Sequence, residues 1–394
     1  MFDADPDGWA RVRLRDLFRE RKERGYDGLP IASVSIESGL VLRSTLDRRV
    51  VSALSNDEHA LARKDDIVYN MMRMWQGACG LAKSDCLVSP AYVVMTPSSA
   101  ISPDFALEML RSPVVVKLLH AYSQGVVDDR LRLYPDAFGQ IPVNIPPLDE
   151  QRRIVEVLQA VDAVTDAARV VTEIAQRSSQ TMRHELLRVS ADGEIADLPA
   201  DWEVRPLETL ATVERGKFSI RPRNDPRYFG GAMPFVQTGD ITSAGDYLTS
   251  HTQTLNDLGV AVSRVFPTGT IMTTIAANIG DFTITTYPVA CPDSVVGIEA
   301  GDDVHPFWLY SVLSCFKVAL DRASTQNAQK NINLQTLRPL LIPVPPRSLM
   351  VELAETIEAA ADAARHAETG WRTVAALKCA VADDLLSGRV RVPA

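Results

Sequence analysis

The sequence predicts an α+β protein made of two tandem copies of one unit, each an α/β globular domain followed by a long helix. Two internal similarities support this. WARVRLRDL, which begins at Trp9, matches WEVRPLETL at Trp202, and IPVNIPPLDEQRRIVEVLQAVDA at Ile141 matches LIPVPPRSLMVELAETIEAAADA at Leu341. The landmarks keep the same order in both copies, as expected for an internal repeat.

The globular part of each copy contains a β-rich run, a polar turn and a second β-rich run. DDIVYNMMRMWQGACGLAKSDCLVSPAYVVM, from Asp65, parallels TGTIMTTIAANIGDFTITTYPVACPDSVVGI, from Thr268. The two tryptophans are 193 positions apart, whereas Pro147 and Pro346 are 199 apart. A net insertion of six residues therefore lies within the second globular part.

A long segment rich in Ala, Glu, Arg and Val follows each Pro-Pro pair, which predicts a helix started by proline. Steps of four and three place a heptad-like stripe on each helix. The stripes comprise Ile154, Leu158, Val161, Thr165, Ala168, Thr172, Ala175, Ser179, Met182 and Leu186, and Leu353, Ile357, Ala360, Ala364, Ala367, Trp371, Val374, Lys378, Val381 and Leu385. Small residues at mid-length favour close packing of the two helices as a coiled coil, with Gly370 as its weakest point.

Some 40 helical residues span on the order of 60 Å, so the two helices would serve as a spacer between two similar domains. That geometry suits a protein that reads two half-sites on DNA. Periodicity alone favours a dimerisation or bundle element that does not set a distance, but the recurrence of the helix after each globular copy favours the spacer.

Composition narrows the function classes. The net charge of −9 and the pI near 5.3 argue against non-specific coating of nucleic acid, although Arg11 to Arg49 is locally basic. No stretch approaches the roughly 20 apolar residues of a membrane span, and the first residues are polar, so we expect a cytoplasmic protein without membrane contact. The five cysteines and six histidines are scattered, which predicts no disulfide framework and no metal site.

Further motifs are PPLDEQRRIVEVLQAVD at Pro146 and DLLSGRVRV at Asp384, in the two helical segments, and MPFVQTGDI at Met233 and AQKNIN at Ala328, within the second globular part. With these, the chain resembles the specificity subunits of type I restriction-modification systems over essentially its whole length. The first copy departs somewhat, since it has only LPIASVSIESG at Leu29 in place of QTGDI and RLRLYPDAFGQ at Arg130 in place of QNAQKNINLQT.

The resemblance implies two target-recognition domains, each reading one half of a bipartite sequence in double-stranded DNA. It implies that the two helices pack antiparallel and set the gap between the two half-sites. It also implies that the helices dock two adenine-methyltransferase subunits, and that restriction and translocase subunits can join. The division expected is residues 1–145 for the first recognition domain, 146–190 for the first spacer helix, 191–344 for the second domain, and 345–394 for the second helix and tail.

No catalytic motif stands out. The string from Asn144 to Leu148 departs from the (N/D)PP(Y/F) pocket of an adenine methyltransferase and is interpreted as the start of a helix. Gly216-Lys217 lacks the rest of a phosphate-binding loop. We therefore expect a chain that is not an enzyme and binds no cofactor, with S-adenosylmethionine bound by the partner methylation subunit.

Residues that read DNA should be polar, carried on loops and able to reach base edges. The candidates are Arg43, Arg73, Gln76, Arg130 and Arg132 in the first domain, and Lys217, Arg221, Arg223, Gln237, Thr238, Asn278, Gln326, Asn327, Gln329 and Lys330 in the second. Trp75 is a candidate for stacking on bases, with core packing as the alternative.

Two other function classes stay open from the residues alone. One is a coiled-coil scaffold that binds only protein partners, which would show no sequence-specific DNA binding. The other is a stand-alone methyltransferase or nuclease, which incubation with DNA and a methyl donor would reveal.

Overall fold

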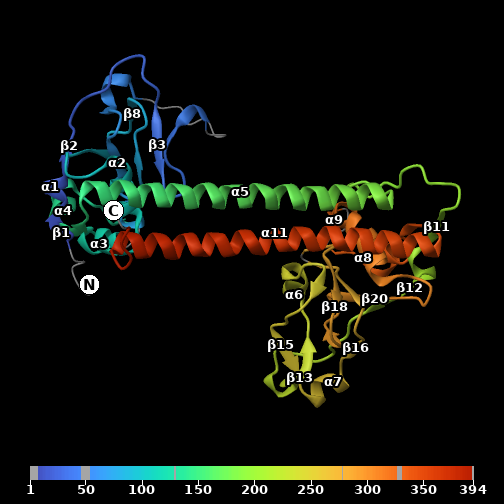
Figure 1. Cartoon of the computed structure of the whole chain (residues 1–394). Coiled ribbons are helices and arrows are strands. Elements are labelled where there is room, and N and C mark those ends of the chain that lie inside the picture. Colours follow the sequence, from blue (N-terminus) through green and yellow to red (C-terminus); the bar gives the residue numbers. More distant parts are fainter. Residues whose placement is uncertain (1–7, 46–53, 128–129, 277, 326–330, 393–394) are drawn as a thin grey trace. The chain divides into compact units, whose positions relative to one another are not determined.

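The structure is a computed structural model that describes residues 8–45, 54–127, 130–276, 278–325 and 331–392 (Figure 1). The chain divides into two compact units. The first unit comprises Met1–Arg169 and Gly370–Ala394, and the second comprises Val170–Thr369. The division falls within both long helices, so each unit contains one globular copy together with a part of each helix.

In the first unit a short antiparallel pair, β1 and β10, lies at the base, and a four-stranded sheet has the order β2-β9-β6-β7. Two small two-stranded sheets, β3-β4 and β5-β8, complete it. The strands are β1 Ala10–Arg13, β2 Phe18–Glu20, β3 Ala32–Ser35, β4 Gly39–Leu42, β5 Ala60–Ala62, β6 Ile67–Asn70, β7 Cys79–Leu81, β8 Cys86–Val88, β9 Tyr92–Pro97 and β10 Pro142–Ile145. The helices are α1 Leu14–Leu17, α2 Pro103–Arg111, α3 Pro113–Tyr122, α4 Pro135–Gln140 and the start of α5, Leu148–Leu187.

The second unit repeats this plan with a larger distal sheet. Its sheets have the orders β11-β21, β12-β20-β17-β18-β14 and β15-β13-β19-β16. The strands are β11 Glu203–Pro206, β12 Ala211–Arg215, β13 Phe229–Phe235, β14 Tyr247–Leu248, β15 Gln253–Leu255, β16 Arg264–Phe266, β17 Ile271–Thr274, β18 Phe282–Thr285, β19 Val289–Cys291, β20 Val295–Ala300 and β21 Leu341–Val344. The helices are α6 Thr238–Ser243, α7 Asp257–Ala261, α8 Pro306–Cys315, α9 Lys317–Thr325, α10 Leu334–Leu337 and α11 Arg347–Ser387.

The repeat found in the sequence is a repeat of structure. The strand that follows each landmark tryptophan pairs antiparallel with the strand that precedes each proline pair, with Ala10 opposite Ile145 and Glu203 opposite Val344. The central strands correspond as well, because the order β2-β9-β6-β7 is matched by β12-β20-β17-β18. The extra length of the second copy lies where β13 to β16 form, and the first copy has only short two-stranded sheets there.

Both long helices begin at the proline pairs. The Pro147 carbonyl accepts the Gln151 N–H at 3.0 Å, and the Pro346 carbonyl accepts the Met350 N–H at 2.9 Å. The residue in the fourth helical position then ties each helix to its globular copy: Gln151 Oε1 accepts the N–H of Ser102, which caps α2, at 2.8 Å. Met350 occupies the same place in the second copy. The Asn144–Leu148 string is thus the end of β10 and the start of α5, as interpreted from the sequence.

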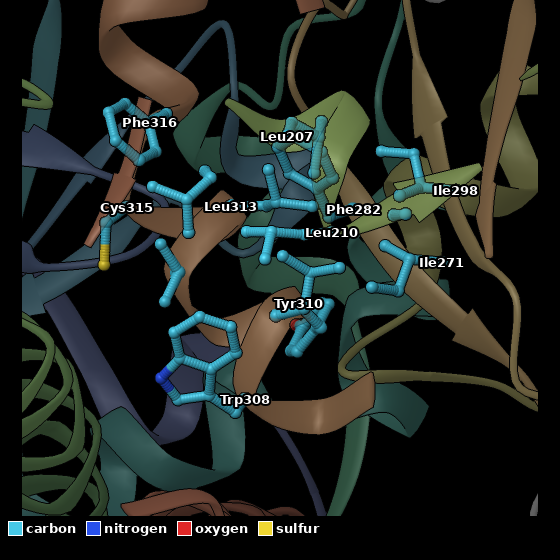
Figure 2. Packing of buried hydrophobic residues seen from close by; sticks show 14 of the residues in the cluster. Leu207, Leu210, Ile271, Phe282, Ile298, Trp308, Tyr310, Leu313, Cys315 and Phe316 are labelled. Atoms are coloured by element: carbon cyan, nitrogen blue, oxygen red, sulfur yellow. The ribbon is translucent and has the colours of Figure 1, made fainter. Parts of the chain in front are cut away.

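Each unit has its own hydrophobic core. The core of the second unit joins the central sheet to α8 and the first turns of α11, and Figure 2 shows Trp308, Tyr310 and Leu313 of α8 packed among Leu207, Leu210, Ile271 and Ile298. Trp308 is fully buried. Each such large side chain contributes about 1.5–3 kcal/mol to the free energy of folding on burial, and this packing holds the sheet against the helices.

The stripes predicted from the sequence line the contact between α5 and α11, and the helices run antiparallel (Figure 1). In the first unit Lys378 Nζ lies 2.6 Å from Asp162 Oδ1. In the second unit Thr172 Oγ1 donates to the Ala367 carbonyl at 3.0 Å. Of the twenty stripe residues only Met182 is exposed, at 36%. Gly370 does not interrupt α11, which continues to Ser387.

Among the described residues, no helix is long and apolar enough to cross a membrane.

Candidate nucleic-acid interface

The connection between β12 and β13 carries three of the predicted DNA-reading residues, Lys217, Arg221 and Arg223. It is held against β19 by Gly216, where an added Cβ would meet Cys291 Sγ and the Pro292 carbonyl oxygen at 2.4 Å. Only glycine fits this approach without a shift of the backbone. The three cationic side chains that follow are exposed.

Arg221 and Arg223 converge on Asp293, at the end of β19. Arg223 Nη2 donates to Asp293 Oδ1 at 2.7 Å and Oδ2 at 3.1 Å, and Arg221 Nη2 lies 4.0 Å from Oδ2. Surface pairs of this kind add little stability, so their main effect is to orient the guanidinium groups.

Gln237 and Thr238 lie at the start of α6. The Gln237 N–H donates to Asp240 Oδ2 at 2.8 Å, and its side-chain Nε2 donates to Gln253 Oε1 at 2.5 Å. On the same short helix Thr242 Oγ1 accepts from Asn278 Nδ2 at 3.3 Å. The structure therefore groups Gln237 with a residue of β15, and Asn278 with α6.

Four predicted residues, Gln326, Asn327, Gln329 and Lys330, lie outside the described residues. The next described residue, Asn331, forms an isolated bridge with Ala276, and the Ile332 N–H donates to the Ile275 carbonyl at 3.0 Å. The return of the chain from 331 onward thus runs beside the start of the loop that carries Asn278.

In the first unit the structure brings two groups of predicted residues together. Arg73 and Gln76 form one turn after β6, where Arg73 Nη1 lies 3.5 Å from Gln76 Oε1. The Leu133 N–H donates to the Met71 carbonyl at 3.0 Å, which places Arg130 and Arg132 on a segment beside that turn. Arg43 belongs elsewhere, since its Nε donates to Ser33 Oγ of β3 at 2.8 Å.

Trp75 packs rather than projecting from this turn. Its indole N–H donates to the Met72 carbonyl at 3.1 Å, and its ring meets His120 of α3 edge-on at 5.6 Å between centroids. The side chain is half-buried. Of the two alternatives, this arrangement favours packing.

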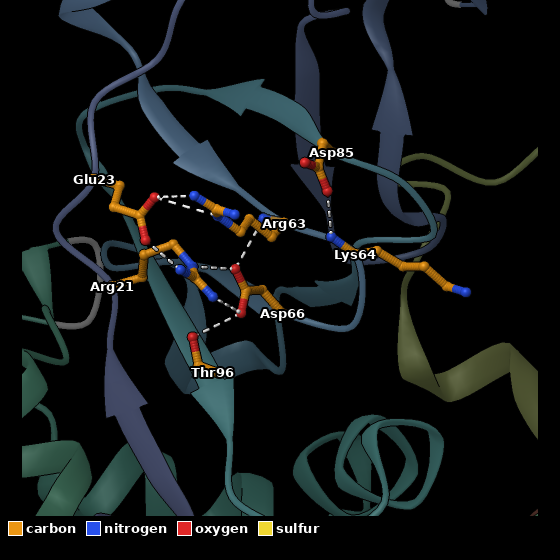
Figure 3. A network of polar contacts seen from close by, with 7 residues as sticks. All are labelled: Arg21, Glu23, Arg63, Lys64, Asp66, Asp85 and Thr96. Carbon is orange, nitrogen blue, oxygen red and sulfur yellow. Dashed lines mark hydrogen bonds and ion pairs between the residues drawn. The ribbon is translucent and has the colours of Figure 1, made fainter.

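The basic stretch near the N-terminus is partly neutralised within the first unit (Figure 3). Arg21 Nε donates to Asp66 Oδ2 at 2.6 Å, and Thr96 Oγ1 donates to Asp66 Oδ1 at 2.7 Å. Arg63 donates to Glu23, and these hydrogen bonds lower the pKa of the Glu23 carboxyl group. Asp66 is 1% exposed. Arg21 therefore serves the fold, which removes it from the cations available for phosphate contacts.

A partly buried carboxylate fixes the globular part of the second unit to its segments of both helices. Asp246 Oδ1 accepts from Tyr310 Oη of α8 at 2.7 Å and from Arg183 Nη2 of α5 at 3.3 Å. Arg365 of α11 donates to Asp246 Oδ2. The Arg183 guanidinium also lies over the Tyr310 ring, 5.6 Å from its centroid. One carboxylate thus sets how α5, α11 and the central sheet of this unit sit together.

The potential metal ligands in the described part of the chain are dispersed. No group of three His, Cys, Asp or Glu side chains there could hold a metal ion. Burial raises the pKa of Cys79 and of Cys315 to about 12, so both stay protonated at neutral pH. A protonated, buried thiol is a poor nucleophile and a poor ligand.

Sequence reasoning missed two polar residues of this interface, Asn224 and Gln253. Asn224 neighbours the predicted Arg223 and lines the same cavity. Gln253 lies on a strand, β15, whereas the predicted contacts were confined to loop residues. No local pattern in the sequence marks it.

Comparisons with known proteins find similarity to type I restriction specificity proteins. The family model of the type I restriction modification DNA specificity domain matches residues 199–361. The type I restriction enzyme MjaX specificity subunit of Methanocaldococcus jannaschii is 22% identical over 260 residues, which cover 64% of this chain and 60% of that protein. The MjaIX specificity subunit of the same organism is 25% identical over 157 residues, covering 39% of this chain and 36% of that protein. The match with MjaX thus spans about 60% of that relative's length.

Solved structures share the fold over nearly the whole chain. The HsdS subunit from Thermoanaerobacter tengcongensis aligns with a TM-score of 0.52 at 18% identity, covering 98% of both chains. The S subunit of a type I restriction-modification system from M. genitalium aligns with a TM-score of 0.58 at 13% identity, covering 98% of this chain and 97% of the other. A chain from a study of type I R-M complex assembly and conformational transition aligns with a TM-score of 0.63 at 19% identity, covering 97% and 98%.

Proposed function

We propose that the chain, which is similar to type I restriction-modification specificity subunits, is the DNA-reading subunit of such a complex. The observation that carries this is the duplication. The family's DNA specificity domain matches the second copy, and the first copy has the same strand order on the same helix pair. Two copies of one recognition unit suit a target with two halves.

We propose the functional division expected from the sequence: recognition domains at 1–145 and 191–344, and helical segments at 146–190 and 345–394. Each domain reads one half of a bipartite site in double-stranded DNA, and the antiparallel helices set the gap. The continuous lengths of α5 and α11, 40 and 41 residues, support this role. At about 1.5 Å per residue each is on the order of 60 Å long.

The side chains proposed to contact DNA are those predicted above. In the second domain Arg223 and Gln237 line one cavity, and the exposed Lys217 and Arg221 lie on the connection that carries Arg223. In the first domain Arg73 and Gln76 share a turn beside Arg132. Arg43 is proposed as a separate contact, and Gln326, Asn327, Gln329 and Lys330 are proposed from the sequence alone.

The helices also expose side chains suited to partner docking. Val171 and Ile174 of α5 are 58% and 59% exposed. Exposed aliphatic side chains of this kind on a surface helix suit a protein partner. We propose that two adenine-methyltransferase subunits dock on the helices, that restriction and translocase subunits can join, and that S-adenosylmethionine binds the methyltransferase subunits.

The chain itself is proposed to be non-catalytic and to act in the cytoplasm, where its DNA target is found. The test is to map adenine methylation in cells with and without the gene. Loss of methylation at one bipartite sequence, restored by the gene, is the expected result. Unchanged methylation would contradict the proposal and favour a scaffold that binds only protein.

A further inference from the structure

The distal part of the second unit contains a cavity of about 460 Å³ that lies among the predicted DNA-reading residues. Three phenylalanines form its apolar wall: Phe218 from the connection before β13, and Phe229 and Phe235 from the two ends of β13. The ring centroids of Phe218 and Phe235 are 5.1 Å apart, those of Phe218 and Phe229 5.7 Å, and those of Phe229 and Phe235 5.9 Å. Phe218 and Phe235 are each 4% exposed, and Phe229 is half-buried.

Polar side chains surround this aromatic wall, and their partners hold them in place. Gln237 uses one amide N–H on Gln253 Oε1. Because an amide side chain has two N–H donors and an oxygen with two lone pairs, this pair keeps donors and acceptors for a ligand. Arg223, held by Asp293, and Asn224 and Ser294 add further polar groups around the same cavity.

The charge of the lining argues for a neutral ligand. Among the described residues that line the cavity, Arg223 is the one cationic side chain, and Asp293 pairs with it at 2.7 Å. A free nucleotide or another phosphorylated molecule would bring two or more negative charges without matching cations. A nucleobase has no charge, a π-face suited to the phenylalanines and a polar edge suited to the glutamines.

The size of the cavity fits the same ligand, since pockets that take small organic molecules occupy roughly 300–1,000 Å³. A base stacked in a duplex offers only its edge to the groove, so a base that enters a cavity must first leave the stack. Building on the proposed function, we propose that this cavity receives one unstacked nucleobase of the half-site read by the second domain. Phe229 stacks on it, and Gln237 and Gln253 read its edge.

The described part of the first unit has no counterpart of this cavity wall. The small core beneath β3, β4, β5 and β8 consists of alanine, valine and cysteine side chains, with Tyr92 packed against it. The proposal therefore predicts an asymmetry between the halves of the target: one base is unstacked in the half-site of the second domain, with no such event in the other half.

The experiment uses the complex of the full chain with its methyltransferase subunits, on duplexes that carry its mapped target. A fluorescent base analogue, 2-aminopurine for purines and pyrrolocytosine for pyrimidines, replaces one base at a time in both half-sites. We expect fluorescence to rise several-fold at one position in the second domain's half, distinct from any base that is methylated.

Two variants test the assignment to this cavity, Gln253→Ala and Phe229→Leu, with Gln335→Ala as the matched control. Gln335 is exposed on α10 and lines none of the cavities described above. The two cavity variants should abolish the extra fluorescence and weaken binding to the cognate duplex by about 10-fold. Binding to a duplex with a scrambled second half-site should stay unchanged, and the control should behave as the wild type. Because Gln253 is an exposed side chain, its variant keeps the test valid if Phe229→Leu fails to fold.

Three results would overturn the inference. These are fluorescence that rises only at methylated bases, a rise in both halves, or cavity variants that weaken cognate and scrambled duplexes equally. In all three the sequence-specific methylation of the complex would persist, so the proposed function would stand. Loss of sequence specificity in the wild-type complex itself would instead remove both proposals.

Discussion

Replacing Asp246 with asparagine should destabilise the second unit by about 3 kcal/mol. Asp246 is 13% exposed and binds Arg183, which is 16% exposed, and Arg365, which is 37% exposed. Removing one partner of a buried ion pair costs roughly 3–5 kcal/mol because a charge remains buried without compensation. The lower end applies here because Arg365 can turn to solvent and the asparagine oxygen still accepts one hydrogen bond.

For a unit of this size, about 1 kcal/mol moves the unfolding temperature by roughly 2–4 °C. Asp246→Asn should therefore lower the unfolding temperature of the second unit by ~10 °C. Hydrogen exchange read by mass spectrometry assigns the effect. Amides of α6, β14 and α8 should lose protection, whereas those of β6 in the first unit should keep theirs.

The matched control is Asp303→Asn. Asp303 also pairs with an arginine at one of the long helices, Arg347, but its side chain is 86% exposed. Exposed pairs contribute little, so the unfolding temperature should move by less than about 2 °C. Equal effects of Asp246→Asn and Asp303→Asn would refute the reasoning, since burial would then not decide the cost.

Further outcomes follow from the helices and the charges. A proline at Val161 or at Ala364 should cost about 3 kcal/mol or more and reduce co-purification of the methyltransferase subunits, and full retention in both variants would count against the helix-pair assignment. Arg391 Nε donates to Glu150 Oε1 at 2.6 Å, and this hydrogen bond lowers the pKa of the Glu150 carboxyl group. That stabilisation is present above the ordinary carboxyl pKa of about 4.3 and is lost as the pH falls through the lowered value, so Glu150→Gln should flatten the acid limb of a stability profile. If the acid limb of the variant is unchanged, the Arg391–Glu150 pair is not the source of the acid-dependent stability. One heptad inserted into both helices should separate the half-sites by roughly 10 Å, or about three base pairs, with both halves kept in any surviving methylation. Exchange of residues 1–143 for the domain of a related subunit should change one half-site, and a change in both would show that the domains do not read independently. The isolated acidic chain should bind DNA weakly at physiological salt, and tight specific binding in a mobility-shift assay would contradict this.

The proposed DNA contacts depend on local groups of exposed cations, which the net charge of the chain does not reveal. An excess of nine negative charges looks unsuited to DNA, yet Arg221, Arg223 and Lys217 are exposed together on one connection. Arg21, by contrast, lies in the basic N-terminal stretch but forms its ion pair with Asp66 inside the fold. Net charge therefore says less about the interface than the internal partners of each cation do.

The sequence by itself determined the duplication, the start of each long helix and the side of each helix that is buried. These features are encoded locally. A proline pair starts a helix within one turn. Apolar residues in steps of four and three identify the buried face of a helix from its own sequence, even when its partner is unknown. The short strands that frame each copy, β1 with β10 and β11 with β21, were not predicted, although they lie at the repeated landmarks.

Only the tertiary structure decided which polar side chains serve the fold and which face the solvent. Asp246 meets Arg183 and Arg365 across separations of 63 and 119 residues, and Gln253 meets Gln237 from a neighbouring segment. No local pattern marks such partners, because the free energy of an ion pair or hydrogen bond depends on burial and geometry that packing creates. The same limit applies to the phenylalanine-walled cavity, since Phe218, Phe229 and Phe235 meet only when β13 folds back along the connection that precedes it.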